Sequence, residues 1–261
     1  MLPGVMLQGL AHQTAVVGSV LASSLNLWRG TLVVRAAAQP PLPLRLYEFE
    51  GCPFCRIVRE ALTALHLDAE IRPCPRGGTR FRPEAEHTGG KLQFPLLVDP
   101  NTNTTLYESR DIVEYLFRTY GGGSVPAFYR GGLVQVALGS LATGTRLGRG
   151  MRARSSRAPE QALHLWSFES SPYSRLVRER LCELELPYTL HNLGKEEWKE
   201  IGPAARRVLP NPYVPREGSK RHAFWLAHQR VQLPYLEDPN TGAALFESQR
   251  IVEYLERTYA A

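Results

Sequence analysis

The feature that most constrains the fold is an internal repeat. Residues 94–120, FPLLVDPNTNTTLYESRDIVEYLFRTY, align without a gap to residues 233–259, LPYLEDPNTGAALFESQRIVEYLERTY, and about 17 of the roughly 27 positions are identical. Upstream, LRLYEFEGCPFCRIVREALTALHLDAEI matches LHLWSFESSPYSRLVRERLCELELPYTL. The chain is therefore predicted to contain two copies of one fold, and the second copy is longer between Leu193 and Arg230.

Each copy has the same predicted order of elements. In the first copy, Pro53 opens a helix, and Val58, Leu62 and Leu65 follow at helical spacing. Ser109 is predicted to cap a second helix that runs to about residue 120. Short apolar segments predict strands at residues 44–49, 69–73, 95–98 and 105–107. A β-α-β unit followed by a hairpin and a helix gives an α/β fold with a mixed four-stranded sheet and helices on its faces, which is the thioredoxin-like arrangement.

Two of the four cysteines form a CxxC motif, Cys52-Pro53-Phe54-Cys55. Cys52 comes just before a helix, where unpaired N–H groups and the helix dipole favour a thiolate, so it is the expected nucleophile. Cys55 lies one turn later and is expected to resolve a mixed disulfide at Cys52. The alternative is a pair of reduced structural cysteines. Cys74, near the end of a strand, is expected to be a small buried hydrophobe.

Three motifs carry a resemblance to a known family. They are the CPFC motif, Pro95 at the start of the third strand, and Glu108-Ser109 before the last helix. With these motifs both copies resemble the N-terminal, glutathione-binding domain of glutathione transferases, and the first is also similar to a glutaredoxin. The chain resembles plastid proteins that carry two such domains in tandem. The predicted domains are residues 42–121 and 162–261, with a Gly/Arg-rich linker at residues 122–161.

The resemblance implies that glutathione is the substrate or co-substrate. It implies a cis proline at Pro95, whose neighbour Phe94 would pair with the glutathione backbone. It also implies that Glu108 and Ser109 hold the γ-glutamyl group. The alternative role of Ser109 is that of an ordinary helix cap. The glutathione-binding residues implied for the first copy are Phe54, Phe94, Pro95, Glu108 and Ser109.

The second copy departs from this pattern. Ser171 and Ser174 replace the two cysteines, so thiol exchange is impossible there. Ser171 is instead a candidate to hydrogen-bond a glutathione thiolate, and a non-catalytic binding or scaffold role is the alternative. The candidate residues of the second copy are Ser171, Leu233, Pro234, Glu247 and Ser248.

The predicted activity is a glutathione-dependent thiol-disulfide oxidoreductase. Cys52 would attack a disulfide or a glutathionylated protein, and Cys55 or glutathione would release it. Two alternatives stay open: glutathione transfer to an electrophile, and a non-catalytic glutathione-binding or iron–sulfur carrier scaffold. The transferase family's all-helical second domain has no counterpart in the repeat. The histidines lack metal-ligand spacing, so no metal site is predicted.

The N-terminal residues 1–38 are predicted to be a transit peptide outside the fold. Residues 1–28 carry no Asp, Glu, Lys or Arg, and the first acidic residue is Glu48. We expect import into a chloroplast, with a mitochondrion as the alternative. A membrane anchor over residues 5–28 is disfavoured because polar side chains interrupt the roughly 20 apolar residues that a span needs. The mature chain is then expected to have no transmembrane segment.

The linker and the overall charge point to no nucleic-acid partner. The formal net charge of the 261 residues is only +6, and the sequence contains no zinc-finger or RNA-binding signature. Between Glu114 and Glu160 the chain has no acidic residue. Residues 132–143 are apolar enough to lie against a domain as a short helix, followed by a basic tail that is expected to be solvated or to dock a partner.

Overall fold

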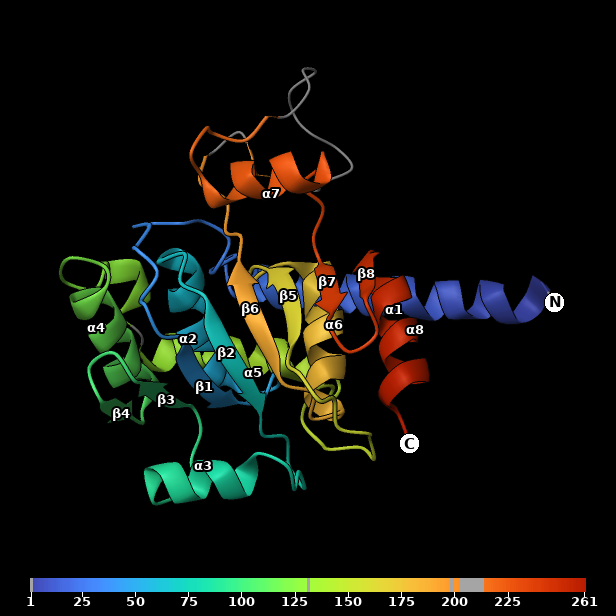
Figure 1. Cartoon of the computed structure of the whole chain (residues 1–261), viewed down its shortest axis with the longest axis horizontal. Helices are drawn as coiled ribbons and strands as arrows, with labels where there is room; N and C mark the ends of the chain where they lie inside the picture. Colours follow the sequence, from blue (N-terminus) through green and yellow to red (C-terminus); the bar gives the residue numbers. More distant parts are fainter. Residues whose placement is uncertain (1, 131, 198–199, 202–213) are drawn as a thin grey trace.

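A computed structural model describes residues 2–130, 132–197, 200–201 and 214–261. Its centre is one eight-stranded sheet with the order β4-β3-β1-β2-β6-β5-β7-β8 (Figure 1). The strands are β1 Leu44–Glu48, β2 Ala69–Pro73, β3 Leu96–Asp99, β4 Thr104–Leu106, β5 Leu163–Ser167, β6 Tyr188–Asn192, β7 Tyr235–Asp238 and β8 Ala243–Phe246. Each half is a four-stranded mixed sheet, so the predicted pair of thioredoxin-like domains is confirmed.

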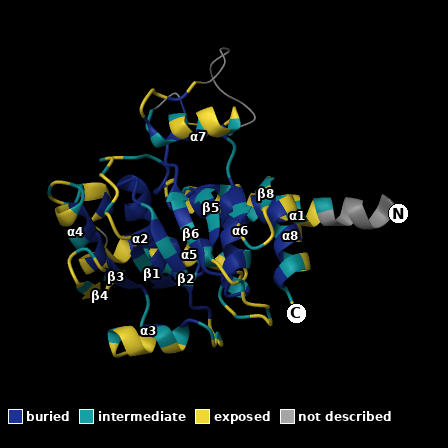
Figure 2. Cartoon of the chain, in the orientation of Figure 1, coloured by how far each residue is buried: buried dark blue, intermediate teal, exposed yellow. Residues whose placement is uncertain are grey.

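The helices divide between the two faces of the sheet. They are α1 Leu2–Leu25, α2 Pro53–Ala64, α3 Arg82–Gly89, α4 Ser109–Thr119, α5 Leu133–Gly144, α6 Pro172–Glu183, α7 Lys220–His228 and α8 Ser248–Tyr259. Residues of α2, α4, α6 and α8 share one hydrophobic core with both halves of the sheet. The helices α3 and α7 cover smaller clusters on the other face. Figure 2 shows the buried residues concentrated in the sheet and the central helices.

The two halves are joined through their sheets. In the first half β1 pairs parallel with β2, and in the second half β5 pairs parallel with β6. A hairpin completes each half, formed by β3 and β4 or by β7 and β8. The strands β2 and β6 then pair antiparallel with each other, with Ile71 opposite Tyr188 and Ala69 opposite Leu190. The repeat predicted two domains; the structure shows that they form one continuous sheet.

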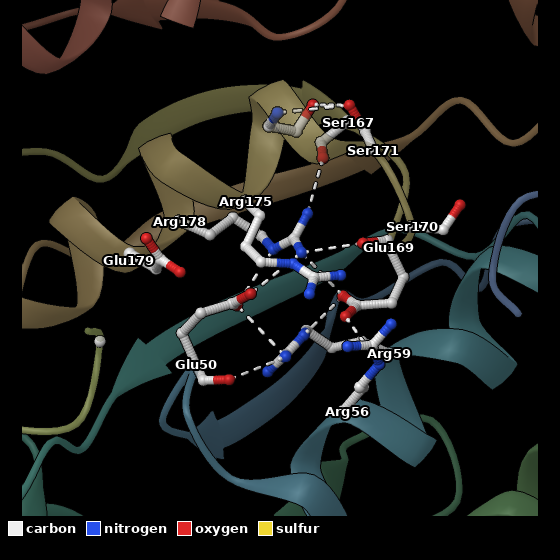
Figure 3. Close-up of polar contacts among 12 residues, drawn as sticks. Glu50, Arg56, Arg59, Ser167, Glu169, Ser170, Ser171, Arg175, Arg178 and Glu179 are labelled. Carbon is white, nitrogen blue, oxygen red and sulfur yellow. Dashed lines mark hydrogen bonds and ion pairs between the residues drawn. The ribbon is translucent and has the colours of Figure 1, made fainter. Parts of the chain in front are cut away.

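A buried network of ion pairs connects the same two halves (Figure 3). Arg59 of α2 donates to Glu169, which follows β5, at 2.8 Å, and lies 3.2 Å from Glu50, which follows β1. Arg178 of α6 lies 3.0 Å from Glu50 and 3.1 Å from Glu169. All four side chains are at most 4% exposed. Each arginine therefore contacts a carboxylate of its own half and one of the other half.

The N-terminal residues are part of this fold, contrary to the expectation that residues 1–38 lie outside it. The helix α1 packs on α6 and α5, and Figure 1 shows it running across the second half and beyond it. Arg29 forms a buried ion pair with Glu60 at 2.9 Å, and Ser23 donates to the backbone of Ser170 at 2.8 Å. The physical reason is that the buried face of this segment carries polar groups that form hydrogen bonds and ion pairs with buried polar groups of both halves. Cleavage and the chloroplast or mitochondrial destination stay predictions.

The linker repeats the arrangement of the N-terminal segment. Residues 133–144 form α5, the short helix that was predicted, and α5 packs on α2 as α1 packs on α6. Gly150, with φ 69°, follows α5 and accepts from the Gly51 N–H at 3.3 Å, as Gly30, with φ 73°, accepts from the Ser170 N–H at 3.2 Å. The duplicated unit thus begins with a helix that precedes each domain. Each of these two helices packs on the helix that follows the CxxC position in the other half, α1 on α6 and α5 on α2.

The basic tail of the linker is only partly solvated. Arg146 is buried and contacts both carboxylate oxygens of Glu179, at 2.6 and 2.8 Å. Arg154, in contrast, is exposed and pairs with Glu256 at 2.7 Å. The tail therefore contributes a buried ion pair between Arg146, just after α5, and Glu179 of α6.

Replacing Arg178 by Met should destabilise the protein by about 3–5 kcal/mol, because it leaves Glu50 and Glu169 buried with less compensation. Urea unfolding followed by circular dichroism measures this loss. The control is Arg118→Met, since Arg118 forms an exposed pair with Glu114 and should lose less than about 1 kcal/mol. Equal unfolding midpoints for the two variants would contradict a role of the network in stability.

Candidate functional site

The CxxC motif lies at the turn between β1 and α2, as the sequence predicts. Cys52 is the N-cap residue of α2, and Pro53 occupies the first turn, where its missing N–H leaves no unpaired donor. The Cys52 Sγ accepts a hydrogen bond from the Cys55 N–H at 3.2 Å. Both thiols are reduced. The predicted nucleophile thus sits in contact with the positive end of a helix.

The two thiols have pKa values that move in opposite directions. The hydrogen bond from the Cys55 side chain lowers the pKa of Cys52, against the opposing effect of burial, and the N–H groups of Cys55 and Phe54 lower it further. Burial raises the pKa of Cys55 well above its ordinary value, and the neighbouring Cys52 raises it more. The first proton lost from the pair therefore leaves Cys52, and Cys55 remains a hydrogen-bond donor to the thiolate.

Both thiols of the motif lie below the surface. Cys52 is 4% exposed, and Cys55 is fully buried. The linker after α4 covers the motif. Its helix α5 approaches so closely that a Cβ on Gly139 would lie 3.2 Å from Pro53. Met151, further along the linker, lies so near the turn that a Cβ on Gly51 would be 2.3 Å from it. Phe54, by contrast, is 44% exposed beside Cys52. Phe54 is therefore the part of the motif that lies at the surface.

Glu108 and Ser109 lie at the start of α4, but their roles differ from the expected cap. The N-cap residue is Glu108, with φ 61°, and the helix begins at Ser109, so the prediction of Ser109 as N-cap is wrong by one position. The Glu108 side chain makes no cap hydrogen bond and instead accepts from Gln93. Ser109 is buried at 8% exposure. The first N–H groups of the helix and the Ser109 hydroxyl are thus grouped at one end of α4, as an anion site needs.

Phe94 and Pro95 precede β3, and the peptide bond between them is cis, as the resemblance implied. The Phe94 ring packs edge-on against Phe49, with ring centroids 6.2 Å apart. The guanidinium of Arg82 lies 5.1 Å from the centroid of the Phe94 ring. Arg82 also donates to the backbone of Cys74 and Pro75, so it is held in place next to the expected glutathione groove.

The second half places Ser171 and Ser248 at the positions of Cys52 and Ser109. Ser171 caps α6 and accepts from the Ser174 N–H at 3.2 Å and from the Ser174 hydroxyl at 2.8 Å. It is 3% exposed. Ser248 begins α8, and its hydroxyl contacts His12 of α1 at 3.1 Å.

The rest of the second half keeps the pattern of the first. The Leu233-Pro234 bond is cis, and Glu247 accepts from Gln232 at 3.4 Å, as Glu108 accepts from Gln93. The backbone of the site is thus duplicated, but α1 occupies the position where a ligand would meet Ser248.

The remaining cysteines, Cys74 and Cys182, lie in the interior of the protein. Cys74 and Cys182 are almost completely buried, and burial raises the pKa of both thiols. Cys182 donates to the backbone carbonyl of Gly150 at 3.3 Å. Cys74 therefore matches its predicted role as a small buried side chain.

The described residues offer neither a cluster of metal-ligating side chains nor a membrane-spanning helix. Among them, no group of three or more His, Cys, Asp or Glu side chains is arranged to hold a metal ion. Within the same residues, no helix has the length and apolarity needed to cross a bilayer.

Sequence reasoning missed the contributions of the leading helices. His12, Gly139 and Met151 all contact the two sites from outside the repeat that was aligned. The available signal was the pair of segments Leu27-Trp28-Arg29-Gly30 and Leu147-Gly148-Arg149-Gly150, which have the same spacing of Leu, Arg and Gly ahead of each domain. Arg56 of α2 is also buried, and it lies 3.1 Å from Glu60.

A comparison with family models matches both halves of the chain. The model for the glutathione S-transferase N-terminal domain matches residues 46–132 and residues 165–261. Comparisons with curated proteins and with solved structures found no significant match. The family match covers more than half of the chain and falls on the two copies of the repeat.

Replacing Cys55 by Ala should raise the pKa of Cys52, because the hydrogen bond from Cys55 is the largest cause of its lowering. The measurement is the pH dependence of iodoacetamide alkylation, with mass spectrometry to locate the modified residue. In the native chain the alkylation of Cys52 should reach half its maximal rate below the ordinary pKa of a cysteine. Cys74→Ala is the control and should leave this midpoint in place; a midpoint insensitive to Cys55→Ala would refute the assignment.

Proposed function

Because the chain belongs to the glutathione S-transferase N-terminal domain family through both of its halves, we propose that it is a glutathione-dependent thiol-disulfide oxidoreductase that acts through Cys52. The observation that carries the proposal is the position of Cys52 at the N-terminus of α2 with a lowered pKa. A thiolate is the attacking species in thiol-disulfide exchange, and a lower pKa increases its fraction at neutral pH. The substrate class is a glutathionylated protein or a protein disulfide.

The first step is attack of the Cys52 thiolate on a sulfur of the substrate disulfide. With a protein–glutathione mixed disulfide, a new bond forms between Cys52 and the glutathione sulfur, and the protein leaves as a thiolate. The leaving thiolate takes a proton from solvent. The helix N-terminus that stabilises the Cys52 anion also favours its release in the next step, because it is a good leaving group.

Two routes regenerate the enzyme. In one, a second glutathione thiolate attacks the Cys52 mixed disulfide, which releases oxidised glutathione and restores the Cys52 thiolate. In the other, Cys55 loses its proton, attacks Cys52 and releases reduced glutathione, which leaves a Cys52–Cys55 disulfide. Two further glutathione molecules then reduce this disulfide, leave as oxidised glutathione and restore the enzyme. The raised pKa of Cys55 makes the second route slower at neutral pH, so the first is expected to dominate.

We propose that glutathione binds in the first half, between the cis Phe94-Pro95 bond and the start of α4. The helix N-terminus with Ser109 would hold the γ-glutamyl carboxylate, and Glu108 would accept from the amino group. Phe54 would line the groove beside the thiol. In the second half we propose a scaffold role, because Ser171 carries no thiol and His12 contacts the Ser248 hydroxyl.

Replacing Cys52 by Ser should abolish reduction of a glutathione mixed disulfide, because serine cannot exchange thiols. Cys55→Ser should keep partial activity through the monothiol route. The measurement is a coupled assay with glutathione, glutathione reductase and a glutathionylated peptide, and Cys74→Ala is the control with full activity. Turnover that survives Cys52→Ser would overturn the proposal. Conjugation of a model electrophile would instead favour transferase chemistry, and visible absorption of anaerobically purified protein an iron–sulfur carrier.

Replacing Ser109 by Ala should weaken glutathione binding by about tenfold or more, the size of a hydrogen bond to a charged group. Titration calorimetry on the Cys52→Ser background measures the binding without exchange chemistry. The matched control is Ser248→Ala, which changes the equivalent residue of the second half and should leave the affinity unchanged. An equal loss in both variants would contradict the assignment of the site to the first half.

A further inference from the structure

The helices α1 and α5 bury several polar side chains and expose several large apolar ones, although α1 also buries Ala15, Val16 and Ala22. The inward face of α1 carries Ser19, Ser23 and Asn26, which are at most 1% exposed. Ser23 is bonded to the backbone of Ser170 and to Arg175. The outward face carries Leu10, Val17 and Leu21, each more than half exposed. A soluble helix normally shows the opposite pattern.

The same inversion occurs in α5. Gln135 points inward and donates to Glu60 at 3.0 Å, and Arg146, just past the helix, pairs with Glu179. The outward side chains are apolar and widely exposed: Leu133 at 89%, Val134 at 73% and Leu141 at 60%. Leu147 follows at 91%. The inward polar groups are needed for the ion-pair network, but they do not explain why the outward positions are apolar.

The two helices present these side chains on a single side of the molecule. The helix α1 packs on α6, α5 packs on α2, and α1 and α5 contact each other, so their remaining faces point away from the same helical layer. The loop before α5 extends the surface, since Phe128, which is 49% exposed, lies over the Arg29 guanidinium at the end of α1. Trp28 is exposed at the same end. Figure 2 shows exposed positions along α1. Together these residues form an apolar surface, which we define as the outward side chains of α1, α5 and their flanking loops.

The charges around this apolar surface indicate its occupant. No acidic residue occurs before Glu48 or between Glu114 and Glu160, so neither helix nor its flanks carry a negative charge. Arg130 and Arg149 are exposed next to the ends of α5. An apolar face with an aromatic residue, a basic border and no acid matches the interface of an anionic bilayer. A second copy of the chain would bring the same positive charges together.

We propose that the α1–α5 face lies on an anionic membrane surface, with its apolar side chains in the interface and the thioredoxin-like halves outside. The helices lie parallel to the bilayer rather than across it, because their inward faces are bonded to the protein. The proposal requires that residues 9–28 remain in the working protein, since they form half of the face. It does not rest on the proposed catalytic activity.

The test is flotation of the full chain with vesicles of phosphatidylglycerol and phosphatidylcholine, compared with phosphatidylcholine alone. The chain should bind the anionic vesicles, and added salt should weaken the binding. The double variant Leu21→Gln/Leu141→Gln should reduce the bound fraction at least about tenfold, because two exposed leucines leave the interface. The matched control is Leu226→Gln on α7, which replaces a leucine of similar exposure, 55%, on the other face of the sheet.

Three results would overturn the proposal. One is the absence of binding to anionic vesicles. Another is equal binding of the double variant and the native chain. The third is a dimer, detected by sedimentation velocity, that the double variant abolishes, because a second copy would then cover the face. Circular dichroism and urea unfolding of each variant establish that the fold is intact, so a loss of binding reports on the surface itself.

Discussion

The crossed ion pairs of Arg59 and Arg178 with Glu50 and Glu169 are the interaction on which the structure depends. Charges buried this deeply are tolerated only when each has several well-placed partners. Here the partners of each arginine come from both halves, so each half contributes to compensating the buried charge of the other. The network explains why the two domains form one body and why α1 and α5 must supply polar groups on their inward faces.

The same network positions the candidate site. Glu50 lies two residues before Cys52, and its backbone carbonyl accepts from Arg59 at 3.2 Å. This hydrogen bond holds the turn that carries the Cys52 thiol. Glu169 holds the equivalent turn before Ser171. The duplication therefore preserves the frame of the site in both halves, while the thiols remain in one. The second half contributes to the first by completing its charge balance.

The sequence predicted the fold of each half and the place of Cys52, because strong repeats and a CxxC before a proline are local signals. It did not predict the joined sheet, since β2 and β6 look like ordinary strands and their pairing depends on two segments about a hundred residues apart. It placed residues 1–38 outside the fold because the outward side chains of α1 are apolar and uncharged, as in a targeting segment. The inward contacts of Ser23 and Arg29 become visible only when Ser170 and Glu60 are in place.

The antiparallel pairing of β2 with β6 also affects how prone each half is to aggregate. In an isolated half, β2 or β6 would be an open edge, and open edges with apolar flanks promote aggregation. In the sheet formed by the described residues, the edge strands are β4 and β8, of three and four residues. Neither half could therefore be separated from the other without exposing such an edge, so the second half protects the first from aggregation although it carries serines at the positions of Cys52 and Cys55.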